Sequence, residues 1–433
     1  MTLWRKCAAH IRQPGLLGLA GANVMLRSSS LGAQFLILII LARALGPAEF
    51  GVFTLIQTTR IIAILLLGFE FNAYSRREIV VAPDAITQTR HIRDQLGISG
   101  IMGLNAIAIS FGAALANLFP VHLAVIVAIL IFVELISQEG IRILYALQRT
   151  MMANWVYFIR SSVWVFLILG LYLYSPHTLT LELTLEIWAA FSASAIMFFF
   201  WSLRAHPWGC VLRTKMDWVW IWRGFRIATP FFVSTAFLNI LSYMPRYMLF
   251  YLRGLEQTGI FGFYTGIAAG IVNLLSTITI PEGMAKAIYS YSLHGEAAFT
   301  RDMHRLWRDA FLLSLLLAAG LLLVFPFILP LVGSQNYPMD WTLLVLVILA
   351  NVAQVGSLVA QTSLYARHRD KEILFSTLGA GTLSAGLQYA LTLIWGMHGL
   401  AIAMALSMVV LTLLFTFFDH KAKKVDGAPP TMR

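Results

Sequence analysis

The sequence predicts an all-α multi-pass membrane protein in which twelve transmembrane helices form two six-helix lobes around a central cavity. Three observations predict this fold class: the apolar composition, the alternating distribution of basic residues, and a polar pattern that occurs in both halves of the chain. Of the 433 residues, 59% are hydrophobic and only 12% are charged, and the mean hydropathy is +0.77. Soluble domains carry charge on about a quarter of their residues, so this composition indicates a chain that lies mostly within a membrane.

Twelve stretches of the sequence are apolar over the length of about 20 residues that an α-helix needs to cross a bilayer. Most are separated by polar or basic segments, whereas Pro120 and Gly396 mark two short separations. The expected spans lie near residues 17–41, 52–74, 95–118, 121–142, 155–175, 183–203, 226–250, 259–280, 309–331, 341–365, 373–394 and 398–418.

The basic residues lie almost entirely on alternate connecting segments. With a cytoplasmic N-terminus, 25 of the 31 Lys and Arg residues fall on the cytoplasmic side, and only Arg43 and Arg253 fall outside. Lys and Arg accumulate on the cytoplasmic side of membrane proteins, and one missed span would exchange the sides of everything after it. The pattern therefore predicts that both termini are cytoplasmic. It also explains the net charge of +11 without a nucleic-acid partner.

A polar stripe occurs once in each half, inside the first and the seventh expected span. In an α-helix, positions i, i+4, i+7 and i+11 lie on one face. Lipid disfavours a polar face, so each stripe is expected to face protein or a water-filled cavity. The two stripes consist of Asn23, Arg27, Ser30 and Gln34 in the first half and Thr235, Asn239, Ser242 and Arg246 in the second.

A second repeated pattern lies on the external hairpin that follows each stripe. Residues 43–54 contain Arg-Ala-Leu and then Phe-Gly-Val-Phe-Thr, and residues 253–265 contain Arg-Gly-Leu and then Phe-Gly-Phe-Tyr-Thr. Since each half holds six spans, the halves are expected to share one orientation, as parallel repeats do; chance similarity in an apolar, Phe-rich chain is the alternative. The expected organisation is an N-lobe at 1–203, a cytoplasmic interfacial linker at 204–225, a C-lobe at 226–418 and a cytoplasmic tail at 419–433.

Four arginines fall within expected spans. Arg27 and Arg60 lie near the middle of the first two spans, where a charge exposed to hydrocarbon costs about 2.5–3.5 kcal/mol. Both are therefore expected to face an aqueous or paired interior, and a buried ion pair with Glu134 or Glu139 is the structural alternative. Arg246 directly follows Pro245 near the external end of the seventh span. Arg160 lies near the cytoplasmic end of the fifth span, where snorkelling to the surface would explain it.

Two acidic residues, Glu134 and Glu139, lie in the fourth span. One interpretation makes Glu134 a counter-ion to an intramembrane arginine. The other makes it a protonatable or cation-binding coupling site, of the kind that proton relays in transporters use. The sequence favours neither.

Neutral polar residues add candidate cavity-lining positions. Gln57 precedes Arg60 by one helical turn, and Asn351 and Gln354 begin a polar stripe in the tenth span that either hydrogen-bonds sugar hydroxyls or packs helices. No nucleotide-binding loop, metalloprotease motif or nucleophile elbow occurs. The connecting segments are too short for a catalytic domain, so the sequence predicts neither an enzyme nor a cofactor or metal site.

The chain resembles the Wzx-type polysaccharide flippases of the multidrug/oligosaccharidyl-lipid/polysaccharide (MOP) exporter superfamily. Four short motifs carry the resemblance along nearly the whole chain: Ala42-Arg-Ala-Leu-Gly-Pro-Ala-Glu-Phe-Gly51, Leu67-Gly-Phe69, Arg142-Ile-Leu-Tyr-Ala-Leu-Gln-Arg149 and Ala228-Thr-Pro230. The family pattern often has an acid before the arginine late in span seven. Pro245 stands there in this sequence.

The resemblance implies two six-helix lobes around a V-shaped, cation-lined cavity. It implies transport of undecaprenyl-diphosphate-linked oligosaccharide from the cytoplasmic to the periplasmic leaflet of a bacterial inner membrane, for O-antigen or exopolysaccharide synthesis. Arg27 and Arg60 match by position the intramembrane arginines of related peptidoglycan-precursor flippases. Arginine suits a diphosphate because its planar guanidinium binds phosphate in a bidentate manner. The expected diphosphate ligands are Arg27, Arg60 and Arg246, and the expected mechanism is alternating access.

Two other functions compete with this expectation. A multidrug or small-metabolite exporter of the same superfamily would share the fold but would require acidic groups for cationic substrates. A membrane-embedded glycan polymerase or ligase would require a large loop with catalytic groups. Expected partners are the lipid-linked oligosaccharide, membrane lipids and polysaccharide polymerase or assembly proteins, and no nucleic acid.

Overall fold

The computed structural model describes the backbone of residues 14–277, 279–333 and 336–426, and the side chains of residues 25–421 within these ranges except residue 240. All regular secondary structure in the described residues is helical, which confirms the predicted all-α class. The helices fall into two compact units. One unit consists of Met1–Ile40 and Thr59–Phe232, and the other consists of Leu41–Thr58 and Val233–Arg433.

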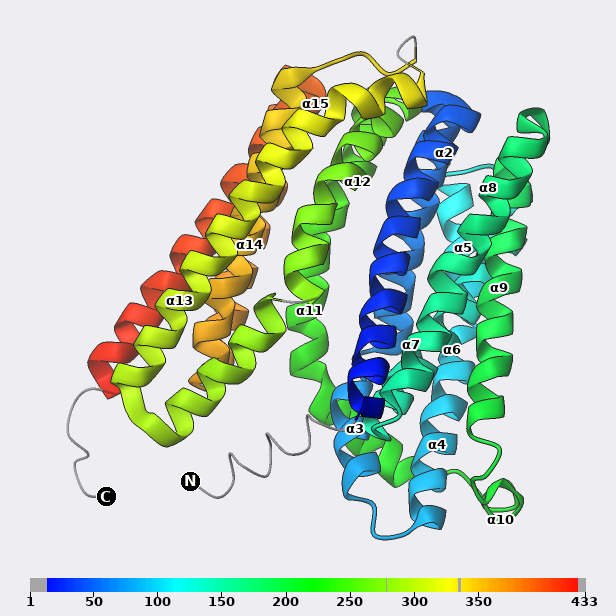
Figure 1. Ribbon diagram of the computed structural model, residues 1–433, viewed down its shortest axis with the longest axis vertical. Coiled ribbons are helices and arrows are strands. Elements are labelled where there is room, and N and C mark those ends of the chain that lie inside the picture. Colours follow the sequence, from blue (N-terminus) through cyan, green and yellow to red (C-terminus); the bar gives the residue numbers. More distant parts are fainter. Residues whose placement is uncertain (1–13, 278, 334–335, 427–433) are drawn as a thin grey trace. The chain divides into compact units, whose positions relative to one another are not determined.

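The first unit is built around α6, which packs against α4, α5, α7 and α9. In Figure 1, α6 and α9 are long helices of this unit, and α5 and α7 are shorter. Part of the core is a cluster that includes the fully buried side chains of Ile92, Leu144 and Phe199. The helices of this unit are part of α2 (Pro14–Gly68), α3 (Asn72–Val81), α4 (Ala85–Gly103), α5 (Ala106–Leu115), η1 (Val121–Leu123), α6 (Ala124–Ala146), α7 (Thr150–Phe158), the π-helix η2 (Ile159–Val163), α8 (Trp164–Tyr174), η3 (Pro176–Thr178), α9 (Leu181–Ser202), α10 (Trp208–Val211) and the first part of α11 (Trp218–Arg253).

The second unit is built around α14, which packs against α12, α13 and α15. Its core includes Leu364 and Phe415, which are almost fully buried. Its helices are the rest of α2 and α11 together with α12 (Leu255–Thr277), α13 (Thr279–Val332), α14 (Trp341–Ala366) and α15 (Asp370–Asp426). The expected lobe boundaries at 203 and 226 stay a prediction.

The described residues hold eight helices, or nine with one bent pair, that are long and apolar enough to cross a membrane. The sequence predicts twelve spans. The numbers differ because α2 and α15 each contain two expected spans in one helical element, and because α12 and α13, with one expected span each, count as a single candidate, Leu255–Val332. Gly46 in α2 and Gly396 in α15, each with a positive φ, interrupt the helix between the two expected spans, whereas Gly295 interrupts α13 before its one expected span at 309–331. The predicted total of twelve spans therefore stays a prediction.

Glycines bring the second part of α2 into backbone contact with α12. A Cβ atom on Gly259 would lie 1.8 Å from the carbonyl oxygen of Pro47, and one on Gly51 would lie 2.2 Å from that of Leu255. Both distances are far shorter than any real Cβ contact, so no larger residue fits without moving the backbone. This contact explains why residues 41–58 belong to the second unit.

Candidate functional site

A buried carboxylate on α6 organises the polar interior of the first unit. The side chain of Glu134 is 3% exposed, and its Oε2 lies 2.7 Å from Nη1 of Arg60 on α2. The same oxygen lies 3.7 Å from Nη1 of Arg160 on η2. Two guanidinium groups therefore share one carboxylate, and the three side chains together carry a net positive charge.

The second oxygen of Glu134 is held by α9. Oε1 accepts hydrogen bonds from Ser192 Oγ at 2.7 Å and from Trp188 Nε1 at 3.2 Å. The Trp188 ring also lies beneath the Arg60 guanidinium, 4.7 Å from its centre, and stacks on Trp164. Each of these contacts is with a hydrogen-bond donor or a cation, so the arrangement is that of a counter-ion site.

The π-helix η2 places Arg160 in this cluster. A π-turn adds one residue to the helical turn and changes the direction of the following side chains. The Arg160 side chain is only 14% exposed and lies toward Glu134. The expectation that Arg160 snorkels to the surface is therefore wrong. The sequence carries no clear signal for the π-helix, because its i→i+5 hydrogen bonds join backbone groups and do not alter the residue pattern of the span.

Arg27 belongs to a second polar cluster. Its Nη2 donates to the Tyr145 hydroxyl at 2.9 Å, and its Nε lies 3.4 Å from Oδ1 of Asn154. The Tyr145 hydroxyl in turn donates to the same Asn154 oxygen at 2.7 Å. Among the described residues, no carboxylate forms an ion pair with Arg27. The expected alternative, an ion pair with Glu134 or Glu139, is therefore present for Arg60 and absent for Arg27.

The rest of the stripe on α2 contacts α7 and η2. Ser30 is fully buried and accepts a hydrogen bond from Ser162 at 2.8 Å. Gln34 is exposed and donates to the Tyr157 hydroxyl at 3.2 Å. These residues contact protein, as a polar face in a membrane requires. The side chain of Asn23 lies outside the described residues.

The residues that contact this stripe are not among the predicted site residues, although the sequence contains a signal for them. Asn154, Tyr157 and Ser161 stand at i, i+3 and i+7 near the start of the fifth span, so they form a polar stripe of the same kind. Asn154 and Tyr157 contact the stripe on α2, and the contact with Ser30 is made by Ser162, the neighbour of Ser161. Two matching stripes predict a helix pair. The contacts of Trp188 and Ser192 with Glu134 have no comparable signal.

Glu139 has partners of its own. Its carboxylate accepts hydrogen bonds from Gln95 Nε2 at 2.7 Å and from Arg142 Nη1 at 2.6 Å. Arg142 is three residues further along the same helix, a spacing at which side chains meet. Glu139 therefore serves as counter-ion to Arg142, and its expected pairing with Arg27 or Arg60 is not found.

The stripe of the second unit makes fewer contacts between helices. Asn239 and Ser242 donate to backbone oxygens of their own helix, those of Thr235 and Leu238. The partly buried Arg246 lies 3.4 Å from the Thr58 hydroxyl and over the ring of Tyr243. Within the described residues, no carboxylate is paired with Arg246.

The remaining candidate positions are less informative. Asn351 is buried, and its side-chain amide donates a hydrogen bond to the carbonyl oxygen of Val347, one turn earlier. Gln57 and Gln354 are partly buried. Among the described residues, no group of three His, Cys, Asp or Glu side chains could hold a metal ion.

The arrangement of the helices is similar to that of known transporter structures. The chain has the fold of the MOP-superfamily transporters. It superposes on a multidrug resistance MATE family transporter of that superfamily in its inward-facing conformation, with a TM-score of 0.76 and 14% identity over 94% of this chain and 100% of that chain. The outward-facing conformation of such a transporter gives a TM-score of 0.64 with 15% identity over 94% and 96%.

A third similar structure is a MOP superfamily transporter from Pyrococcus furiosus, with a TM-score of 0.58 and 13% identity over 92% of this chain and 96% of that chain. The reverse polarity of the binding pocket in that transporter suggests a different function for it. A search of the curated proteins finds no match.

The sequence identifies the family. Residues 20–285 match the family described as polysaccharide biosynthesis protein. This match covers more than half of the chain, so the protein belongs to that family, and the resemblance noted in the sequence is confirmed.

Proposed function

We propose that this protein is a flippase that moves undecaprenyl-diphosphate-linked oligosaccharide from the cytoplasmic to the periplasmic leaflet of a bacterial inner membrane. The polysaccharide biosynthesis family and the MOP transporter fold support a flippase or exporter. The charge of the intramembrane side chains supports an anionic substrate.

The environment of Arg27 is the main support for the proposal. It lies within an expected span and is held only by the neutral groups of Tyr145 and Asn154 among the described residues. A guanidinium without a counter-ion in a membrane is costly, and such residues usually mark a substrate or ion pathway. A diphosphate would supply the missing charge through charge-assisted hydrogen bonds.

Two further groups fit the same substrate. Arg246 has no carboxylate partner among the described residues, and Glu134 compensates only one of its two arginines. We assign the diphosphate to Arg27, Arg60 and Arg246, with the lipid tail remaining in the bilayer. Arg27 and Arg60 have different partners, and their binding of one diphosphate is part of this proposal.

This interpretation makes Glu134 a counter-ion and not a coupling site. It also disfavours a multidrug exporter for cationic substrates, because the buried acids Glu134 and Glu139 are already paired with arginines. Both termini would lie in the cytoplasm, and polysaccharide polymerase or assembly proteins would receive the product.

Transport in proteoliposomes tests the proposal. Full-length protein is reconstituted with lipid-linked oligosaccharide from the host cell, and a membrane-impermeant glycosidase is added outside. The fraction of glycan cleaved should rise above that in protein-free vesicles. A neutral polyprenyl glycoside without the diphosphate should not be moved. Extrusion of cationic dyes without movement of the lipid would instead identify a multidrug exporter.

A further inference from the structure

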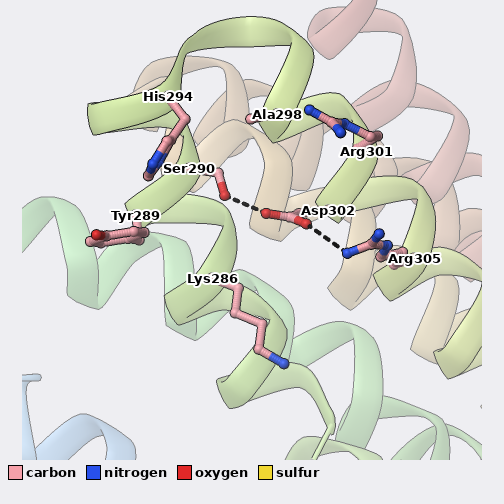
Figure 2. A pocket seen from close by; sticks show the side chains of 8 residues that line it. All are labelled: Lys286, Tyr289, Ser290, His294, Ala298, Arg301, Asp302 and Arg305. Atoms are coloured by element: carbon pink, nitrogen blue, oxygen red, sulfur yellow. Dashed lines mark hydrogen bonds and ion pairs between the residues drawn. The ribbon is translucent and has the colours of Figure 1, made fainter. Parts of the chain in front are cut away.

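A basic pocket lies in the second unit, apart from the intramembrane arginines. Its volume is about 350 Å³, and it is formed where Gly295 interrupts α13. Gly295 has φ of 76°, a left-handed conformation that favours glycine. Figure 2 shows the two arms of α13 facing each other, with Lys286, Tyr289 and His294 on one arm and Arg301 and Arg305 on the other.

Cations dominate the lining of the pocket. Lys286, Arg301 and Arg305 contribute three positive charges, and Asp302 contributes the one carboxylate among the lining residues. Lys286 is paired with Glu282 on its own helix at 2.6 Å. Asp302 is already engaged, because it accepts a hydrogen bond from Ser290 and lies 3.7 Å from Arg305. Within the described part of the chain, no hydrogen bond or ion pair holds the Arg301 guanidinium. The pocket therefore presents the uncompensated positive charge and the unused donors of Arg301, beside two cations that are already paired.

The turn that forms the pocket is fixed to the rest of the unit. Arg367, at the end of α14, has a fully buried side chain that pairs with Glu296 and with Asp419 on α15. Its guanidinium also lies over the rings of Tyr291 and Phe299, on either side of Gly295. These contacts hold the two arms together, so the pocket does not depend on the exposed cations for its shape.

The surroundings of the pocket indicate a membrane interface. Residues 281–308 form an expected cytoplasmic segment that leads into an expected span at 309–331. The arm of α13 before Gly295 exposes apolar and aromatic side chains, since Tyr289 is 59% and Leu293 is 66% exposed. Basic groups beside exposed apolar and aromatic groups are typical of segments that contact anionic lipid on the cytoplasmic side.

We propose that this pocket binds a phosphate group, and that the group belongs to an anionic phospholipid of the cytoplasmic leaflet. Arg301, Arg305 and Lys286 contact the phosphate, while Tyr289 and Leu293 contact the lipid at the level of the headgroups. The site is distinct from the arginines assigned to transport, and it stands whether or not the transported substrate is a lipid diphosphate.

Lipid binding to purified full-length protein tests the proposal. Native mass spectrometry in detergent counts bound phosphatidylglycerol, with phosphatidylcholine as the zwitterionic comparison. One basic residue near an anionic lipid surface is worth about 1 kcal/mol, so Arg301→Gln should weaken phosphatidylglycerol binding by about fivefold. Arg308→Gln is the matched control, because Arg308 lies on the same arm, outside the lining, and is paired with Asp309. It should leave binding unchanged.

A second variant tests the cavity without changing charge. Ala298 lines the pocket, and Ala298→Phe should reduce phosphatidylglycerol binding by filling the space. Soluble glycerol phosphate distinguishes the source of the phosphate. If glycerol phosphate binds and its binding depends on Arg301, while phosphatidylglycerol does not bind, then the phosphate site is supported and the lipid source is wrong. If Arg301→Gln and Arg308→Gln behave alike, the proposed site does not exist.

Discussion

Arg60 and Glu134 form a direct ion pair, with 2.7 Å between Nη1 and Oε2, and Glu134 is also shared with Arg160. The two partners are therefore not equivalent. Without Arg60, the carboxylate keeps Arg160, Ser192 and Trp188. Without Glu134, both guanidinium groups lose their counter-ion. This asymmetry separates the structural role of Glu134 from the substrate role proposed for Arg60.

We expect Glu134→Gln to destabilise the protein more than Arg60→Gln. A partly buried charge left without its partner costs about 3–5 kcal/mol, and the first change leaves two such charges. Thermal unfolding of the purified variants in detergent measures the difference. The double variant Glu134→Gln with Arg160→Gln leaves one such guanidinium group in place of two, and it should recover part of the lost stability. An Arg60→Gln variant less stable than Glu134→Gln would contradict the shared counter-ion.

Arg27→Ala should reduce glycan export in cells by about tenfold or more, because a hydrogen bond to a charged group contributes about 1.5–3 kcal/mol. Arg27→Lys should restore only part of the export, since lysine lacks the bidentate guanidinium. The amount of folded protein in the membrane should stay unchanged.

Tyr145→Phe is the matched control for this prediction. It removes one hydrogen bond of Arg27 but keeps the charge, so export should fall much less than with Arg27→Ala. Normal export by the Arg27→Ala variant would show that Arg27 does not bind the substrate.

The helical class could be predicted from the sequence because hydropathy and charge alternation act within single segments. The partners of the intramembrane charges could not, because the neighbours of a span depend on packing between segments distant in the chain. Arg60 illustrates the limit: its carboxylate was one of two candidates, and only the contact between α2 and α6 decides between them. The expectation that Arg160 snorkels to the surface is wrong because a π-helix changes the direction of a side chain without changing the sequence pattern.

The repeated hairpin motif also has a structural counterpart. Arg43 Nη1 donates to the carbonyl of Leu331 near the end of α13, and Arg253 Nη2 donates to that of Leu393 just before the break at Gly396. Each arginine thus satisfies a carbonyl near the end of a helical arm, where such groups lack helical partners. The shared role is consistent with a true repeat, since chance similarity would not require it.

The contact of α2 with α12 predicts that Gly259→Ala disrupts the second unit. The new Cβ would lie 1.8 Å from the Pro47 carbonyl oxygen, and both groups belong to helix backbones that cannot move independently. The melting temperature and the yield of folded protein should both fall. Gly320→Ala is the control, because Gly320 lies within α13 with open space around it. It should be neutral or slightly stabilising, since alanine favours helix by about 0.5–1 kcal/mol over glycine.

The topology predicts opposite locations for the two ends of α14. This helix has 26 residues, which at about 1.5 Å per residue exceeds the roughly 30 Å of the hydrocarbon core. Arg367, Arg369 and Lys371 follow it, and such a basic cluster favours the cytoplasm. A compartment-specific reporter fused after Asn336 should therefore be external, and one fused after Arg369 should be cytoplasmic. A fusion after Arg433 should agree with the fusion after Arg369, because two further spans separate them. Reporters after Asn336 and Arg369 on the same side would mean that α14 does not cross the membrane, and the division into six and six spans would be wrong.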